Sequence, residues 1–179
     1  MKHEAINRQD VIDADRFVLR ALSPSDAGLI EAATGDARVA HMTPAIPFPL
    51  PEGAAEEFIL QSLAADRVED VWAIDGRLSG MPPVLGLVSL RDMGREQSEI
   101  GYWVAPSFWG QGVAREAVSA LLTVNPHANR SVFGSVFQDN PASARVLEAS
   151  GFQYLGEAEA FSLSRAAHVP TWNYLKSMQ

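Results

Sequence analysis

The sequence contains no cysteine, which excludes disulfide bonds and catalysis by a thiolate. It has no apolar run of membrane-spanning length, and its first residues lack the apolar segment of a signal peptide, so we expect a cytoplasmic protein that does not bind a membrane. Internal repeats and low-complexity tracts are also absent. The 179 residues therefore fit one domain, expected to span residues 1–179, with a substantial core.

Positive charge is scarce, with 14 lysines and arginines against 22 aspartates and glutamates and a formal net charge of −8. Nucleic-acid binders usually present a basic face, so we expect no nucleic acid as a partner. A polyanionic ligand would have to be held by local geometry, whereas a cationic amine is compatible with the acidic balance. His3, His127 and His168 show no metal-ligand spacing, so no metal is expected.

Hydrophobic periodicity and turn residues divide the chain into alternating strands and helices. Strands are expected at residues 16–20, 71–75, 84–91, 96–104, 131–137, 153–157 and 171–175, and helices at 24–33, 52–67, 113–124 and between Asn140 and Gly151. Several prolines between residues 35 and 51 indicate an irregular loop. The alternation predicts an α/β layered domain with a mixed sheet.

A loop with two glycines, Gly110 and Gly112, joins the strand that ends near Val104 to the helix that begins near Val113. Because a glycine has no Cβ, a ligand can approach the backbone closely at both positions. Several N–H groups can then point into one concavity, where the helix dipole adds positive potential. The loop is a candidate site for a pyrophosphate; the structural alternative is a tight connection that needs small residues.

A second block, residues 139–152, has the signals of a short helix with both ends defined. Asn140 is a good N-cap, Pro141 suits the first helical position, and Gly151 suits the left-handed residue after the end.

Together, in this order and at this separation, the two blocks resemble the GNAT superfamily of acyl-CoA-dependent N-acyltransferases. Residues 109–114 are similar to the pyrophosphate loop of that superfamily. The second block is similar to its N-x-x-S-x-x-x-L-x-x-x-G-F segment, with these residues in register: Asn140, Ser143, Leu147, Gly151 and Phe152. Residues 16–27 also resemble the branch that contains the ribosomal-protein N-terminal acetyltransferases. The resemblance covers most of residues 15–158 and implies a mostly antiparallel central sheet, flanked by helices, with splayed central strands.

The resemblance implies acetyl-CoA as a co-substrate. Its pantetheine would lie between the strands 99–104 and 131–137, beside the main chain near Trp103 and Val104, which could also donate to the oxyanion. The residues that the resemblance assigns to cofactor binding are Trp103, Val104, Trp109, Gly110, Gln111, Gly112, Val113, Ala114, Asn140, Ser143 and Arg145. Trp109 departs from the pattern, since arginine or glutamine is commoner there. Arg115 or Arg145 could supply the missing charge, or either could lie on a solvated helix surface.

Two residues are candidates for the chemistry. Many relatives carry a tyrosine one turn before the glycine of the second block, where this chain has Leu147, so Ser143 becomes the candidate to stabilise the leaving thiolate. Glu99, which alternation places on one face with Gly101 and Trp103, is the candidate base; an exposed edge carboxylate is the alternative. Asn140 could act only as a helix cap. His41 could border the acceptor pocket or be structural.

The residues and the resemblance predict an N-acetyltransferase that works by direct transfer in a ternary complex, since the chain has no cysteine and no recognisable nucleophile–histidine pair. The acceptor would be a primary amine, either a protein N-terminus or a small molecule. The alternative is a non-catalytic acyl-CoA-binding sensor or regulatory module. A homodimer is also considered.

Overall fold

The computed structural model describes residues 9–179. Within this range the strands are β1 (Ile12–Asp13), β2 (Val18–Ala21), β3 (Glu69–Asp75), β4 (Gly86–Gly94), β5 (Gln97–Val104), β6 (Ser131–Phe137), β7 (Gln153–Ser162) and β8 (Ala167–Ser177). The α-helices are α1 (Ala27–Thr34), α2 (Ala37–Ala40), α3 (Ala54–Ser62), α4 (Val113–Val124) and α5 (Pro141–Ala149), and short 3-10 turns precede α1 and follow β3 and β5. None of the described helices is long and apolar enough to cross a membrane.

All the described strands form one sheet in the order β1-β2-β3-β4-β5-β6-β8-β7. Every neighbouring pair is antiparallel except β5 and β6, which are parallel. Helix α4 makes the crossover between these two strands, as parallel neighbours require. The expected mixed, mostly antiparallel sheet with flanking helices is confirmed.

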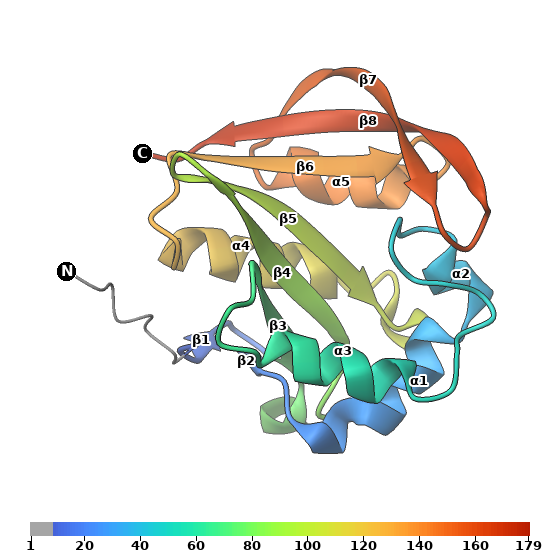
Figure 1. Cartoon of the computed structure of the whole chain (residues 1–179). Coiled ribbons are helices and arrows are strands. Elements are labelled where there is room, and N and C mark those ends of the chain that lie inside the picture. The colour runs from blue at the N-terminus through green and yellow to red at the C-terminus, as the bar shows by residue number, and fades with distance from the viewer. Residues whose placement is uncertain (1–8) are drawn as a thin grey trace.

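The helices cover the two faces of the sheet (Figure 1). Helices α4 and α5 pack on one face, which we call the α4 face, and contribute side chains such as Leu121 and Leu147 to the main core. Helices α1 and α3 pack on the other, which we call the α3 face, where Ile30 and Ile59 meet Leu87 of β4 in a second cluster. Strand residues therefore alternate between the two clusters.

Strands β5 and β6 separate halfway along their length. Their pairing runs from Gln97↔Ser131 to Ile100↔Gly134 and stops there. Beyond that point β5 stays paired with β4 as far as Val104, while β6 stays paired with β8 as far as Phe137. The last residues of the two strands therefore border a gap, and the expected splayed strands are confirmed.

Several expected boundaries were wrong. Residues 163–166 form the turn of a long hairpin, so β7 and β8 extend well beyond 153–157 and 171–175; cross-strand hydrogen bonding there offsets the weak strand preference of residues such as Ala158 and Ala160. Helix α3 ends at Ser62 instead of residue 67, and beyond it the Arg67 side chain donates to Ala64 O and to Asp70. The expected loop 35–51 contains α2, which is capped by Asp36.

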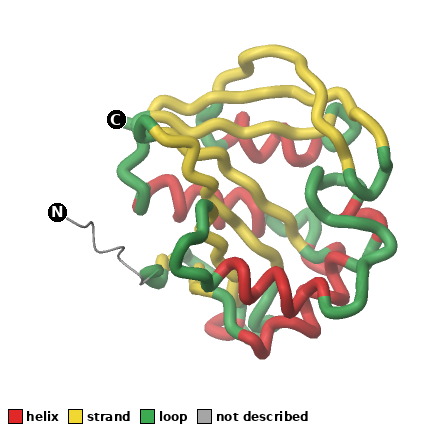
Figure 2. Tube along the Cα trace, in the orientation of Figure 1, coloured by secondary structure: helices red, strands yellow, loops and turns green. Residues whose placement is uncertain are grey.

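The β7–β8 turn meets the segment that follows α2 (Figure 2). The N–H of Leu163 donates to Pro44 O, and Ser164 Oγ donates to Ala40 O. The guanidinium of Arg165 donates to His41 O at 2.6 and 2.9 Å. These bonds tie the far end of the sheet to the helices of the α3 face.

Candidate active site

The loop before α4 presents main-chain N–H groups that have no partner in the described part of the protein. Gly110 and Gly112 adopt left-handed φ angles of 73° and 74°, and the first bond of the helix runs from Glu116 N–H to Gly112 O. Within residues 9–179, none of the N–H groups from Gly110 to Arg115 donates a hydrogen bond of ordinary geometry. Since these donors lie at the positive end of a 12-residue helix, the loop can accept an anion.

Arg16, which precedes β2, brings positive charge to this loop. Its Nη2 donates to Gln111 O at 3.0 Å, and its Nε pairs with Glu116 at 2.8 Å. A side-chain carbon built on Gly112 would lie 3.7 Å from the same Nη2. Sequence reasoning missed this residue, because 95 positions separate it from Gln111 and no local motif links the two.

The two arginines proposed for that charge, Arg115 and Arg145, lie near the starts of α4 and α5. Arg115 and Arg145 are exposed on α4 and α5, and neither makes an ion pair with another described residue. Nothing in their contacts directs them toward the loop.

Trp109 uses its side-chain donor within the protein. The indole N–H donates to Val104 O at 2.7 Å, and the Arg38 guanidinium lies 5.5 Å from the centre of the ring. The indole is therefore not a free donor for a phosphate. Instead, it fixes the end of β5 against the start of the loop.

The main chain of β5 alternates between β4 and the gap. Ala105 N–H donates to Leu85 O on the β4 side, so the N–H of its neighbour Val104 points toward the gap. The carbonyl of Trp103 faces β4, where a side-chain carbon on Gly86 would collide with it. Val104, and by the same alternation Tyr102, therefore presents its main-chain N–H to the gap, whereas Trp103 does not.

Ser143 lies at the start of α5, on the α4 face. Asn140 caps this helix, since its side chain accepts from Ser143 N–H at 3.4 Å. Ser143 Oγ donates to the Tyr102 hydroxyl at 2.9 Å, and that hydroxyl donates to Ser143 O, also at 2.9 Å. Burial raises the pKa of Tyr102 above its usual value. Sequence reasoning did not single out Tyr102 and missed this pairing.

Leu147, at the position where many relatives carry a tyrosine, is part of the core. Only 1% of its surface is exposed, and its methyl groups lie against Gly134 of β6. A side-chain carbon on Gly134 would lie 2.8 Å from one of them. Leu147 therefore offers no proton donor, while the Tyr102–Ser143 pair joins β5 to the start of α5.

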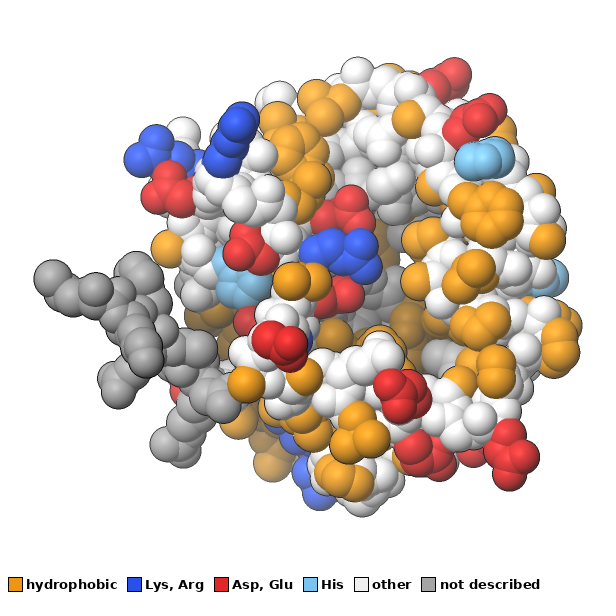
Figure 3. Space-filling view, viewed as in Figure 1, with side chains coloured by type: hydrophobic (Ala, Val, Ile, Leu, Met, Phe, Trp, Pro, Cys, Tyr) orange, Lys and Arg blue, Asp and Glu red, His pale blue; other side chains and the backbone are white. Residues whose placement is uncertain are grey.

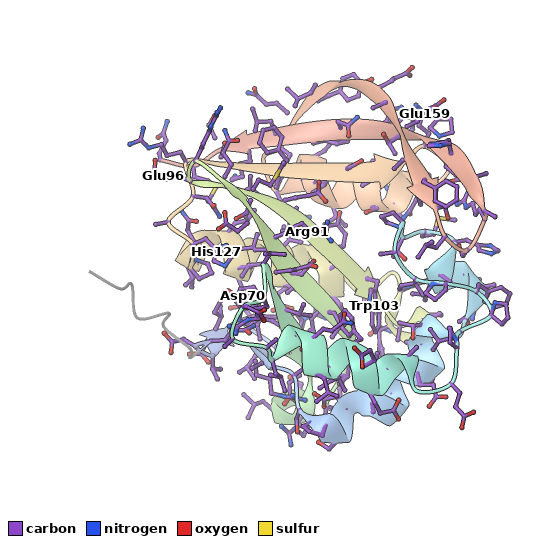
Figure 4. The ribbon with its side chains drawn as sticks, in the orientation of Figure 1. Asp70, Arg91, Glu96, Trp103, His127 and Glu159 are labelled. Carbon is purple, nitrogen blue, oxygen red and sulfur yellow. The ribbon has the colours of Figure 1, made fainter. Side chains whose placement is uncertain are left out.

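Glu99 lies on the α3 face, opposite Arg91 of β4 and beside Phe133 of β6. Its side chain is exposed and makes no hydrogen bond to a described residue. Figure 3 shows a hollow on this face, with a basic side chain beside acidic ones at its edge. In the same view, Figure 4 places Arg91 and Trp103 on β4 and β5 at that edge. Glu99 and Ser143 therefore lie on opposite faces of the sheet.

His41 borders this face through its main chain and its ring. Its carbonyl accepts from Arg165, and its ring meets Phe48 edge-on at 5.6 Å. Arg165 also pairs with Asp139 at 2.6 Å, which lowers the pKa of Asp139. His41 therefore lies at the border of the α3 face, and its contacts show no chemical role.

His127 lies away from the gap, next to Asp70 (Figure 4). Its Nε2 is 2.8 Å from Asp70 Oδ2, and its Nδ1 is 3.1 Å from Ser98 Oγ. The bond from His127 is the largest cause of a lowered pKa at Asp70. Ser98 is fully buried, whereas His127 and Asp70 are partly exposed and line a pocket together with Arg67 and Asn129. His3 lies outside the described residues, and the His168 ring packs edge-on against Phe161.

The described residues thus combine a glycine loop with free main-chain N–H groups and a gap between two parallel strands. Residues 16–153 match the model of the acetyltransferase (GNAT) domain family. The match spans most of the chain, so the chain belongs to the GNAT acetyltransferase family and is an acyltransferase.

Individual proteins agree with this assignment. The protein YoaA of Bacillus subtilis (strain 168), described as an uncharacterized N-acetyltransferase, is 29% identical over 153 residues, which cover 82% of this chain and 84% of that protein. The microcin C7 self-immunity acetyltransferase MccE, solved with acetyl-CoA and AMP, has a TM-score of 0.78 at 18% identity and covers 91% of this chain and 93% of its own. The ribosomal-protein-S5-alanine acetyltransferase from Vibrio fischeri has a TM-score of 0.77 at 19% identity, with 96% and 98% covered. Both structures share the fold.

Proposed function

We propose that this chain transfers the acetyl group of acetyl-CoA to a primary amine by direct attack in a ternary complex. One observation carries the proposal. Strand β5 ends at Val104 beside the gap to β6, and a short connection then leads directly to the free N–H groups of residues 110–115. A pyrophosphate held by the first can therefore extend a pantetheine chain into the second.

The residues present fit this co-substrate. Gly110 has open space around its missing Cβ, and Gly112 meets only the Arg16 guanidinium, so a phosphate can approach both. Arg16 adds charge, although Glu116 neutralises part of it. When bound, acetyl-CoA supplies the thioester carbon that the amine attacks. The N–H of Val104 can donate to the oxygen that becomes negative during this attack.

The Tyr102–Ser143 pair is placed to serve the departing sulfur. Ser143 belongs to the first turn of α5, so the helix N-terminus favours negative charge beside it. A hydroxyl that now donates to Tyr102 can turn and donate to a thiolate instead. Ser143 and the bound phosphates would then lie on the α4 face, while the amine approaches from the α3 face.

We propose a protein N-terminus or a small-molecule amine as the acceptor. The V. fischeri structure is that of a ribosomal-protein acetyltransferase, and another neighbour, the Vibrio cholerae spermidine N-acetyltransferase, was solved with CoA and spermine. The net charge of −8 favours the approach of either cation.

Three further parts of the proposal concern the whole chain. We propose one domain, because β8 pairs with β6 along all seven residues of β6 and so joins the C-terminal hairpin to the matched region. We also propose a cytoplasmic enzyme that can form a homodimer. The dimer is supported by exposed apolar side chains on β7 and its turn, Tyr154, Leu155, Phe161 and Leu163, along an edge strand.

Release of free CoA tests the activity. Acetyl-CoA is incubated with the protein and either a peptide with an N-terminal alanine, a peptide with an N-terminal serine, or spermine, and the new thiol is measured. We expect saturable, amine-dependent release with at least one of these acceptors and an acetylated product of the matching mass. Saturable CoA binding without thiol release across the panel would instead favour the sensor.

A further inference from the structure

A polar pair on the α3 face lies beside the point where β5 leaves β6. Ser89 of β4 is directly opposite Gly101 of β5, and Gly101 is the first residue of β5 after the pairing with β6 ends. A side-chain carbon built on Gly101 would lie 3.0 Å from Ser89 Oγ. The serine oxygen thus occupies the space above Gly101, next to the gap.

Ser89 is connected to a carboxylate. Its hydroxyl donates to Glu69 Oε1 at 2.7 Å, while Arg91 Nη2 lies 3.4 Å from Glu69 Oε2. Glu69 is at the start of β3, and among the described strands β3 pairs only with β2 and β4. Strand β4 therefore separates Glu69 from β5 and the gap, and Ser89 of β4 provides the connection between them. Because Ser89 donates its hydroxyl hydrogen to Glu69, the lone pairs of Ser89 Oγ remain available to accept a proton.

We propose that Ser89 and Glu69 form the route by which the acceptor amine loses its proton. The inference rests on the proposed acetyl transfer and adds to it a named proton acceptor. An N–H bond of the ammonium breaks and its proton bonds to Ser89 Oγ, while the original hydroxyl proton of Ser89 moves to the Glu69 carboxylate. The net change converts an ammonium and a carboxylate into a neutral amine and a carboxylic acid, so atoms and charge balance.

Ser89–Glu69 fits this task better than Glu99 does. Glu99 belongs to the part of β5 that is still paired with β6, two residues before Gly101, and no described side chain connects it to the gap. The Ser89 oxygen is held above Gly101 by a short bond, and Ser89 is only 9% exposed. A group that is fixed in place and close to the reacting atoms accepts a proton more effectively than a mobile exposed one.

The test compares Glu69→Gln, Ser89→Ala and Ser89→Thr with the unchanged protein. Glu31→Gln, which removes an exposed carboxylate on α1, serves as the matched control. The acceptor is the alanine peptide, or spermine if the unchanged protein acetylates spermine instead. We measure kcat/KM from below to above the pKa of the acceptor amine, together with CoA affinity and thermal unfolding.

At a pH where the amine is mostly protonated, we expect Glu69→Gln and Ser89→Ala to lower kcat/KM by about 100-fold, the lower end of the usual effect of a positioned base. The deficit should shrink as the pH rises through the amine pKa, because the free amine is then already neutral. Ser89→Thr keeps the hydroxyl and should retain most of the activity, and Glu31→Gln should match the unchanged protein.

Two outcomes would overturn the proposal. One is an unchanged kcat/KM in both variants, and the other is a deficit of the same size at every pH, which would indicate a structural role. If the unchanged protein releases no thiol with any acceptor, the proposed function itself fails, and CoA binding then shows whether the loop assignment survives.

Discussion

Replacing Arg20 with methionine should destabilise the protein strongly, because Arg20 joins two buried carboxylates. Its guanidinium donates to Asp75 at 2.7 Å and twice to Asp26 at 2.9 Å, and it also donates to Pro83 O. The side chains of Asp26 and Asp75 are only 3% and 4% exposed. Without Arg20, two negative charges remain in the interior with fewer partners. Loss of one member of a buried ion pair typically costs about 3–5 kcal/mol, and we expect a value in this range.

The charge on Asp75 makes this cost depend on pH. Burial works to raise the pKa of Asp75, but bonds from Arg77 and Arg20 outweigh it and lower the pKa from 3.8 to about 2. A carboxyl with a lowered folded-state pKa adds stability above pH ~4, and that stability is lost as the pH falls toward 2. The shift corresponds to about 2 kcal/mol. The deficit of Arg20→Met should therefore narrow over the same interval.

Urea denaturation followed by tryptophan fluorescence measures the difference. Arg77→Met is the matched control, because Arg77 binds the same Asp75 but is 64% exposed and should contribute only about 0.2–1 kcal/mol. A deficit below 1 kcal/mol for Arg20→Met at pH 7, or one equal to that of Arg77→Met, would refute the reasoning.

Three further substitutions have defined outcomes. Gly86→Ala should lower the free energy of unfolding by about 1–3 kcal/mol, because its methyl group would collide with the main-chain carbonyl of Trp103. Chemical denaturation measures this difference, and an unchanged free energy of unfolding would contradict the prediction. Gly28→Ala, in an open position on α1, should raise that free energy by about 0.5–1 kcal/mol, and a loss in the same assay would contradict this. Ser143→Ala should lower kcat while leaving CoA affinity unchanged, since its hydroxyl bonds to Tyr102 and is assigned to the sulfur; equal kcat in steady-state assays would remove it from the mechanism.

The sequence predicted the elements whose signals are local. The run of β-branched and aromatic residues at 131–137 and the helix from Val113 to Val124 appear with the expected bounds. The Asn140 cap is also confirmed. These features depend on neighbouring residues, so a single sequence is sufficient to find them.

Features that depend on tertiary contact could not be predicted in this way. Arg16 approaches the glycine loop only because the segment between β1 and β2 lies at one side of the sheet and α4 packs near β1. Tyr102 looked like an ordinary strand residue, yet it bonds to Ser143, which is 41 positions away. Glu69 gains its connection to the gap only through the register of β3, β4 and β5. No local motif records which side chains a register brings together.

Calorimetric titration of CoA against Gly112→Asp tests the central claim most directly. The Cβ of the new side chain would lie 3.7 Å from Arg16 Nη2, and its carboxylate would repel the pyrophosphate while competing for that arginine. The control is Gly53→Asp, since Gly53 is also a left-handed N-cap glycine with open space, at α3 instead of α4. We expect Gly112→Asp to weaken CoA binding at least about tenfold, or 1.4 kcal/mol, and Gly53→Asp to leave it unchanged. Equal affinity in both variants would contradict the claim that these main-chain groups hold the pyrophosphate.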